Sequence, residues 1–110
     1  MPKDDAVYVA HMLETARRAL RIVEGKRSVD FFADETLRLA LTRLVQVIGE
    51  AARRVSVGFV QTHPEVPWKA VTGMRNKLVH DYMGVDEDMI WDTVTKELPS
   101  LVTALDRLVR

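Results

Sequence analysis

An apolar stripe between Asp34 and Val55 constrains the fold more than any other feature of this sequence. Apolar residues recur there at alternating steps of four and three, at Leu37, Leu41, Leu44, Ile48, Ala51 and Val55. This spacing is typical of one face of an α-helix. Because the stripe extends over three heptads, we expect a long helix that packs on another helix of the bundle or on a second copy of the chain.

Other segments also have helical patterns, and Gly and Pro separate them. Residues 5–24 carry a second apolar stripe that ends at Gly25. Pro67 suits the first turn of a third helix over residues 68–82, where its missing N–H is tolerated. The one substantial loop is expected between Val57 and Pro67.

The C-terminal quarter predicts one further helix or two. Asp86 suits the N-cap of a fourth helix, and Pro99 removes a backbone donor from its middle. We therefore expect a kink at Pro99, or a short fifth helix from Ser100. No segment has the alternation of a β-strand, so the predicted fold is all-α, an antiparallel bundle of four to five helices in a single domain, residues 1–110.

Composition narrows the class of protein. The 110 residues are 47% hydrophobic and 29% charged, which suits a single globular domain, and no apolar run approaches the roughly 18 residues of a membrane span. The N-terminus has no signal-peptide pattern, so we expect a cytoplasmic protein without membrane partners. The chain has no cysteine, which excludes disulfides and thiolate metal sites.

The net charge of zero argues against a protein that coats nucleic acid, and no DNA partner is expected. Basic residues nevertheless gather in residues 17–27 and 69–77, and acidic residues in 86–97. A local positive face could bind a short polyanion, but the charges fit an ordinary mixed surface equally well.

The segment 74–84 combines four side chains that suit phosphodiester chemistry: Arg75, Asn76, His80 and Tyr82. At about 100° per residue, all four lie outside the apolar side of the predicted third helix, which consists of Ala70, Val71, Met74 and Leu78. Arg presents a forked set of donors to phosphate oxygens, and His can carry a proton near neutral pH. Taken singly, each is more often a surface or packing residue.

Two other interpretations of these residues are open. His11, Glu50, His63 and His80 could be ligands of a metal hydrolase, but no pair has ligand spacing, so neither a metal nor a cofactor is expected. Glu50 could instead support the site, although a structural role is favoured. The chain could also be a non-catalytic interaction module.

The motif and its surroundings resemble the HEPN superfamily, and more narrowly the HepT toxins of HepT–MntA toxin–antitoxin systems. The likeness covers essentially the whole chain, and no motif position is substituted. It rests on Phe31, Phe32 and Asp34, on residues 48–52 (IGEAA) and 63–68 (HPEVPW), and on residues 73–76 (GMRN) and 78–82 (LVHDY).

The resemblance implies a metal-independent endoribonuclease that works as a homodimer, with Arg75 and His80 catalytic and Asn76 and Tyr82 supporting. It also implies a cognate MntA-like nucleotidyltransferase antitoxin that adds AMP to Tyr82. The alternative is a non-catalytic helical partner of such an enzyme. Because RNA cleavage by 2′-hydroxyl attack needs both an acid and a base, we expect two copies of His80 in one dimer cleft, with Val79 at the interface.

Overall fold

The structure is a computed structural model of the 110-residue chain, and it describes residues 3–78 and 86–109. Regular structure in these ranges is entirely helical. The elements in chain order are α1 (Lys3–Val23), α2 (Ser28–Ala33), α3 (Glu35–Arg53), α4 (Val57–Thr62), α5 (Trp68–Leu78), α6 (Glu87–Asp92), the π-helical turn η1 (Thr93–Glu97) and α7 (Leu98–Val109). The predicted all-α class is confirmed.

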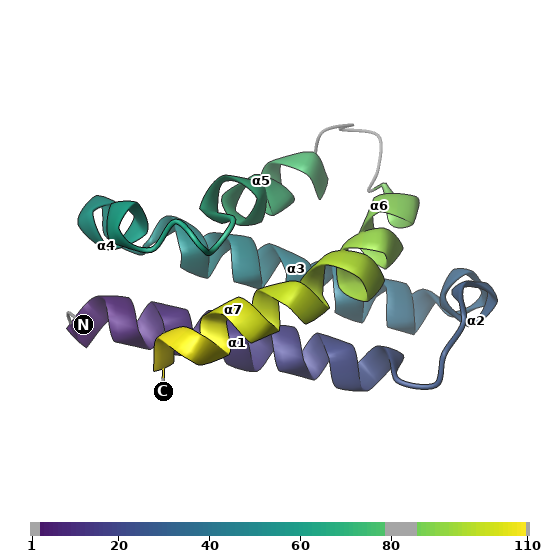
Figure 1. Ribbon diagram of the computed structural model, residues 1–110. Coiled ribbons are helices and arrows are strands. Elements are labelled where there is room, and N and C mark those ends of the chain that lie inside the picture. Colours follow the sequence, from purple (N-terminus) through teal and green to yellow (C-terminus); the bar gives the residue numbers. More distant parts are fainter. Residues whose placement is uncertain (1–2, 79–85, 110) are drawn as a thin grey trace.

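The long helices form an antiparallel bundle (Figure 1). α1 and α3 lie side by side in opposite directions, α5 packs on α3, and α7 packs on α1. α3 also contacts α2 and α6, so it is the helix with neighbours on most sides.

The α3 stripe is buried within the chain's own core. Leu41 and Ile48 are completely buried, and Leu37, Ala51 and Val55 are at most 7% exposed. The suggestion that this stripe forms a dimer surface is therefore wrong, because the same chain already covers it. Heptad spacing shows that a helix has a partner, but it cannot show whether that partner belongs to the same chain.

Two short helices were not expected. α2 precedes α3, and α4 lies where a loop was predicted; each has only six residues. Six residues are too few to show helical periodicity. Each is fixed by one buried aromatic residue and one local hydrogen bond. In α2 Phe31 is buried, and the Asp30 carboxylate accepts the Arg27 N–H. In α4 Phe59 is buried, and the Ser56 hydroxyl accepts the Phe59 N–H.

Capping residues fix the ends of several helices. The Asp86 carboxylate accepts the Met89 N–H at 3.1 Å, which confirms the N-cap predicted there. The Asp34 carboxylate, for which no cap was predicted, accepts the Leu37 N–H at 3.1 Å. After α1, Gly25 has a φ of 76°, a left-handed conformation that favours glycine. α5 begins at Trp68, so Pro67 directly precedes the helix instead of lying in its first turn.

The interruption predicted at Pro99 is present, but it lies one turn earlier and has another form. The chain stays helical through Pro99, the second residue of α7, and the π-turn η1 separates α6 from α7. The Leu98 N–H bonds to the Thr93 carbonyl, five residues back. A proline ring crowds the carbonyl four residues before it, and the wider π-turn provides room there.

A buried carboxylate joins the start of α1 to the start of α4. Asp5 is 3% exposed and accepts hydrogen bonds from the Ser56 backbone N–H at 2.8 Å and from the Ser56 hydroxyl at 2.7 Å. These two bonds hold the pKa of Asp5 below its ordinary value of 3.8, and the bond from the Ser56 hydroxyl has the larger effect.

We predict that Asp5→Asn lowers the melting temperature at pH 7, because the charged form of Asp5 is the one that the fold stabilises. A carboxyl with a lowered folded-state pKa contributes stability that is present above pH 3.8 and is lost as the pH falls below it. The difference between the melting temperatures of wild type and variant should therefore shrink below about pH 4. Asp4→Asn, at an exposed neighbouring position, is the control. A difference that stays constant down to pH 2.5 would contradict the assignment.

Candidate functional site

The motif lies on and after the end of α5, and the structure tests it only in part. Arg75 and Asn76 belong to the last described turns of α5, and their side chains lie outside the described part. Val79, His80 and Tyr82 lie outside the described residues altogether. Whether the four site residues come together therefore stays a prediction, and the structure describes only the packing of the helix on which the motif begins.

The first half of α5 is held firmly. Val71 is completely buried and Met74 is 6% exposed, which confirms two residues of the predicted core side. The Trp68 indole N–H donates to the His63 carbonyl at 2.8 Å, and Trp68 is 7% exposed, so this residue belongs to the core. Ala70, which was assigned to the same apolar side, is instead exposed.

The two flanks of α5 have opposite electrostatic character. On the flank that carries Ala70 and Met74 lies an acidic pocket of about 290 Å³, between α5 and the segment from Asp86 to Glu97. On the flank that carries Trp68 and Thr72 lies a groove of about 450 Å³, which we call the basic groove. The acidic pocket is lined by Val45, Ala70, Met74, Asp86, Asp88, Met89, Asp92, Thr93 and Glu97, and the basic groove by Ala52, Arg53, Val55, Val57, Val60, Trp68, Lys69 and Thr72.

The other basic segment of the sequence is largely used in ion pairs. Arg17 on α1 bonds to Asp106 on α7 at 2.8 Å, Arg18 approaches Glu14 at 3.5 Å, and Arg27 lies 3.9 Å from Asp30. These pairs favour the ordinary-surface interpretation for residues 17–27.

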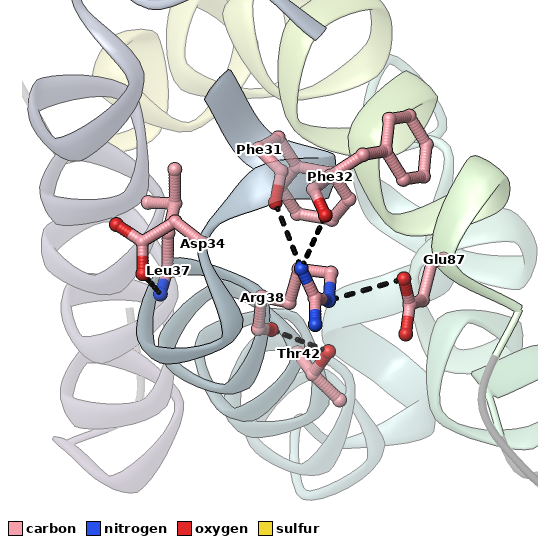
Figure 2. A network of polar contacts seen from close by, with 7 residues as sticks. All are labelled: Phe31, Phe32, Asp34, Leu37, Arg38, Thr42 and Glu87. Atoms are coloured by element: carbon pink, nitrogen blue, oxygen red, sulfur yellow. Dashed lines mark hydrogen bonds and ion pairs between the residues drawn. The ribbon is translucent and has the colours of Figure 1, made fainter. Parts of the chain in front are cut away.

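The chain returns from the motif segment at α6, and an arginine of α3 fixes this point (Figure 2). The Arg38 guanidinium donates to the Phe32 carbonyl at 2.6 Å and to the Phe31 carbonyl at 3.4 Å, at the end of α2. Its Nε lies 3.2 Å from the Glu87 carboxylate, in the first turn of α6. One side chain thus joins α2, α3 and α6. Sequence reasoning missed Arg38, because no local pattern reveals a partner 49 residues away.

The residues considered for a metal site are only partly brought together. His11 and Glu50 line one depression between α1 and α3, and Glu50 also lies 3.6 Å from Arg43. His63 is elsewhere, 3.0 Å from the Glu65 carboxylate. Two hydrogen bonds lower the pKa of Glu65. The bond from its own backbone N–H has the larger effect, and the bond with the His63 ring has the smaller one. Across residues 3–78 and 86–109, no three potential ligands cluster as a metal site would require.

None of the described helices has both the length and the apolar character needed to cross a membrane.

The fold is an all-helical, HEPN-like bundle whose motif helix packs on the central helix. The family model described as Ribonuclease HepT-like matches residues 12–108, and the chain belongs to this family.

Relatives of known sequence agree with this membership. A protein of Caldanaerobacter subterraneus subsp. tengcongensis, named as a candidate RNase, is 39% identical over 94 residues, which are 86% of this chain and 84% of the relative. A probable ribonuclease HepT of Thermococcus cleftensis is 36% identical over 100 residues, 87% of this chain and 91% of the relative. No solved structure matches the chain significantly.

We predict that Arg38→Met lowers the free energy of unfolding by about 1.5–3 kcal/mol, the usual range for hydrogen bonds that involve a charged group. Urea denaturation followed by circular dichroism would measure it. Arg43→Met on the same helix is the matched control, because the Arg43–Glu50 pair is more exposed and should contribute at most about 1 kcal/mol. Equal losses in the two variants would show that Arg38 does not fasten α2 and α6 to α3.

Proposed function

We propose that this protein is a metal-independent endoribonuclease and the toxin of a toxin–antitoxin pair. One observation carries the proposal: the matched family is that of ribonuclease HepT, and this chain has the complete Arg75-x4-His80-x-Tyr82 motif on and after the helix that packs on α3. Two relatives that are named as ribonucleases match this chain over most of their length, which supports the same activity.

The residue types fit cleavage by attack of the RNA 2′-hydroxyl on the adjacent phosphate. His80 would move the proton, as base for the 2′-hydroxyl or as acid for the leaving 5′-oxygen. Arg75 would stabilise the charge on the phosphorane oxygens with its fixed positive charge. Asn76 would donate a neutral hydrogen bond to the substrate or orient the imidazole, and Tyr82 would contact the phosphate or a base.

A homodimer would complete the site. The motif supplies one imidazole per chain, whereas the reaction needs both an acid and a base. A two-fold axis near the end of α5 would place two copies of His80 and Arg75 in one cleft, with Val79 at the contact. The buried α3 stripe is unavailable for this contact, so the dimer surface must be formed by other residues.

The antitoxin proposed for this toxin is a nucleotidyltransferase that transfers AMP to the Tyr82 hydroxyl. The adduct would place an anionic phosphodiester beside Arg75, where the RNA phosphate is proposed to bind. It would therefore both block the site and compete for its positive charge.

We expect His80→Ala to lower the rate of RNA cleavage by about 100- to 10,000-fold, the range for losing a general acid–base group, and Arg75→Ala by about 100- to 1,000-fold. Cleavage of a fluorophore–quencher RNA by purified protein would measure both rates. Wild-type activity should persist in EDTA. Loss of activity in EDTA would exclude the metal-independent mechanism, and equal activity of wild type and His80→Ala would favour the non-catalytic partner.

Tyr82→Phe should escape the antitoxin, because the acceptor hydroxyl is absent. Intact-mass measurement after incubation with the cognate transferase and ATP should show additions of about 329 Da, the mass of an AMP group, on wild type but not on the variant. Tyr8→Phe, which alters a tyrosine on α1, is the matched control and should still be modified. Silencing of Tyr82→Phe without any added mass would indicate inhibition by binding alone.

A further inference from the structure

The basic groove is an apolar channel with cations on its edge. Its apolar lining consists of Val55 between α3 and α4, Val57 and Val60 of α4, and Trp68 at the start of α5. Val57 is 72% exposed, the largest exposure among the large apolar residues that the structure describes.

The charges at the edge of the groove are unneutralised. Arg53 and Lys69 line it, both exposed, and no carboxylate is among its lining residues. Within residues 3–78 and 86–109, neither cation pairs with a carboxylate, unlike Arg17, Arg18 and Arg27. The opposite flank of α5 is lined by four carboxylates. A polyanion that approaches α5 is therefore attracted to the groove side and repelled from the other.

The groove also shares a helix face with the first two positions of the motif, Arg75 and Asn76. Thr72 lines the groove, and Arg75 and Asn76 occupy the positions three and four residues further along α5. Positions with this spacing are neighbours on one helix face, displaced by about 4.5–6 Å along the axis. The groove is thus about one nucleotide's length from the start of the motif.

From these observations we propose that the basic groove is a subsite for the RNA strand beside the cleaved bond. One nucleobase packs on Val55, Val57 and Val60, and the adjoining phosphates contact Arg53 and Lys69. This subsite rests on the proposed ribonuclease function and specifies where its single-stranded substrate lies. Sites for single strands usually combine a positively charged groove with side chains on which bases pack, most often aromatic ones; in this groove valines take that place.

Charge favours RNA over a second copy of this chain as the occupant. A two-fold contact through the groove would bring each basic edge toward its own copy, and like charges oppose such a contact. The apolar lining also offers no pattern of donors and acceptors that would select a base. The Thr72 hydroxyl donates to the Lys69 carbonyl at 3.2 Å, so its proton is already used. The subsite therefore accepts any base.

Binding can be measured apart from cleavage. The probe is a labelled single-stranded 2′-O-methyl octanucleotide of mixed sequence, which lacks the attacking hydroxyl. A second set of probes has the same sequence, and each member carries one abasic position. Lys69→Gln should weaken binding by about threefold to tenfold and reduce the slope of log K against log salt by about 0.7, the loss of one phosphate contact. Val57→Ser should weaken it about threefold to tenfold through the lost apolar contact.

Matched variants separate the groove from general effects. Lys26→Gln removes an exposed cation outside the groove, and Val29→Ser removes a valine of α2 that is 58% exposed. Neither change should alter the affinity for the probe. One abasic position should weaken binding to wild type and have no further effect on Val57→Ser, because both changes remove the same contact.

The outcomes distinguish the subsite from the proposed function. Unchanged affinity of both Lys69→Gln and Val57→Ser would overturn the subsite, while cleavage of unmodified RNA by wild type would leave the ribonuclease standing. Dissociation of a dimer by Val57→Ser in sedimentation velocity, with RNA affinity unchanged, would overturn the subsite in favour of a chain–chain contact. A wild-type protein that neither binds nor cleaves RNA would overturn both.

Discussion

Burial of α3 between α1 and α5 is the contact on which the rest of the structure depends. Val47 and Ala51 of α3 line a depression shared with α1, whereas Val45 and Ala52 line the depressions on either flank of α5. Leu41 and Ile48 are completely inside. Each such side chain contributes roughly 1.5–3 kcal/mol by leaving water, so this one helix supplies a large part of the core. Because α5 packs directly on α3, the position of the motif helix follows from the same burial.

The segment that carries His80 and Tyr82 is bounded by two fixed anchors. On one side, Trp68 is bonded to the His63 carbonyl and Val71 is completely buried. On the other, Asp86 caps α6, and Arg38 holds Glu87 against the end of α2. A catalytic constellation needs support from elements whose own positions are set by packing. For the site proposed here, that support is supplied by the core of the bundle and by the network in Figure 2.

A net charge of zero conceals a clear separation of charge across α5. Four acids of residues 86–97 line the pocket on one flank, and Arg53 and Lys69 line the groove on the other. Net charge describes solubility and long-range attraction, whereas the path of a bound strand depends on where the charges lie. The separation gives a polyanion one favoured approach to the motif helix. It also explains how a chain with no net positive charge can belong to a ribonuclease family.

The sequence by itself determined the all-α class, the positions of the long helices and the cap at Asp86, because periodicity and capping are local properties of the chain. It also carried the motif that identifies the family. Tertiary structure decided the rest. It placed the α3 stripe inside one chain, since a heptad pattern does not identify its partner. It formed α2 and α4 around Phe31 and Phe59, since short helices depend on burial more than on propensity. It joined Arg38 to Glu87 and brought Arg53 and Lys69 to one groove, since residues distant in sequence come together only after the helices pack.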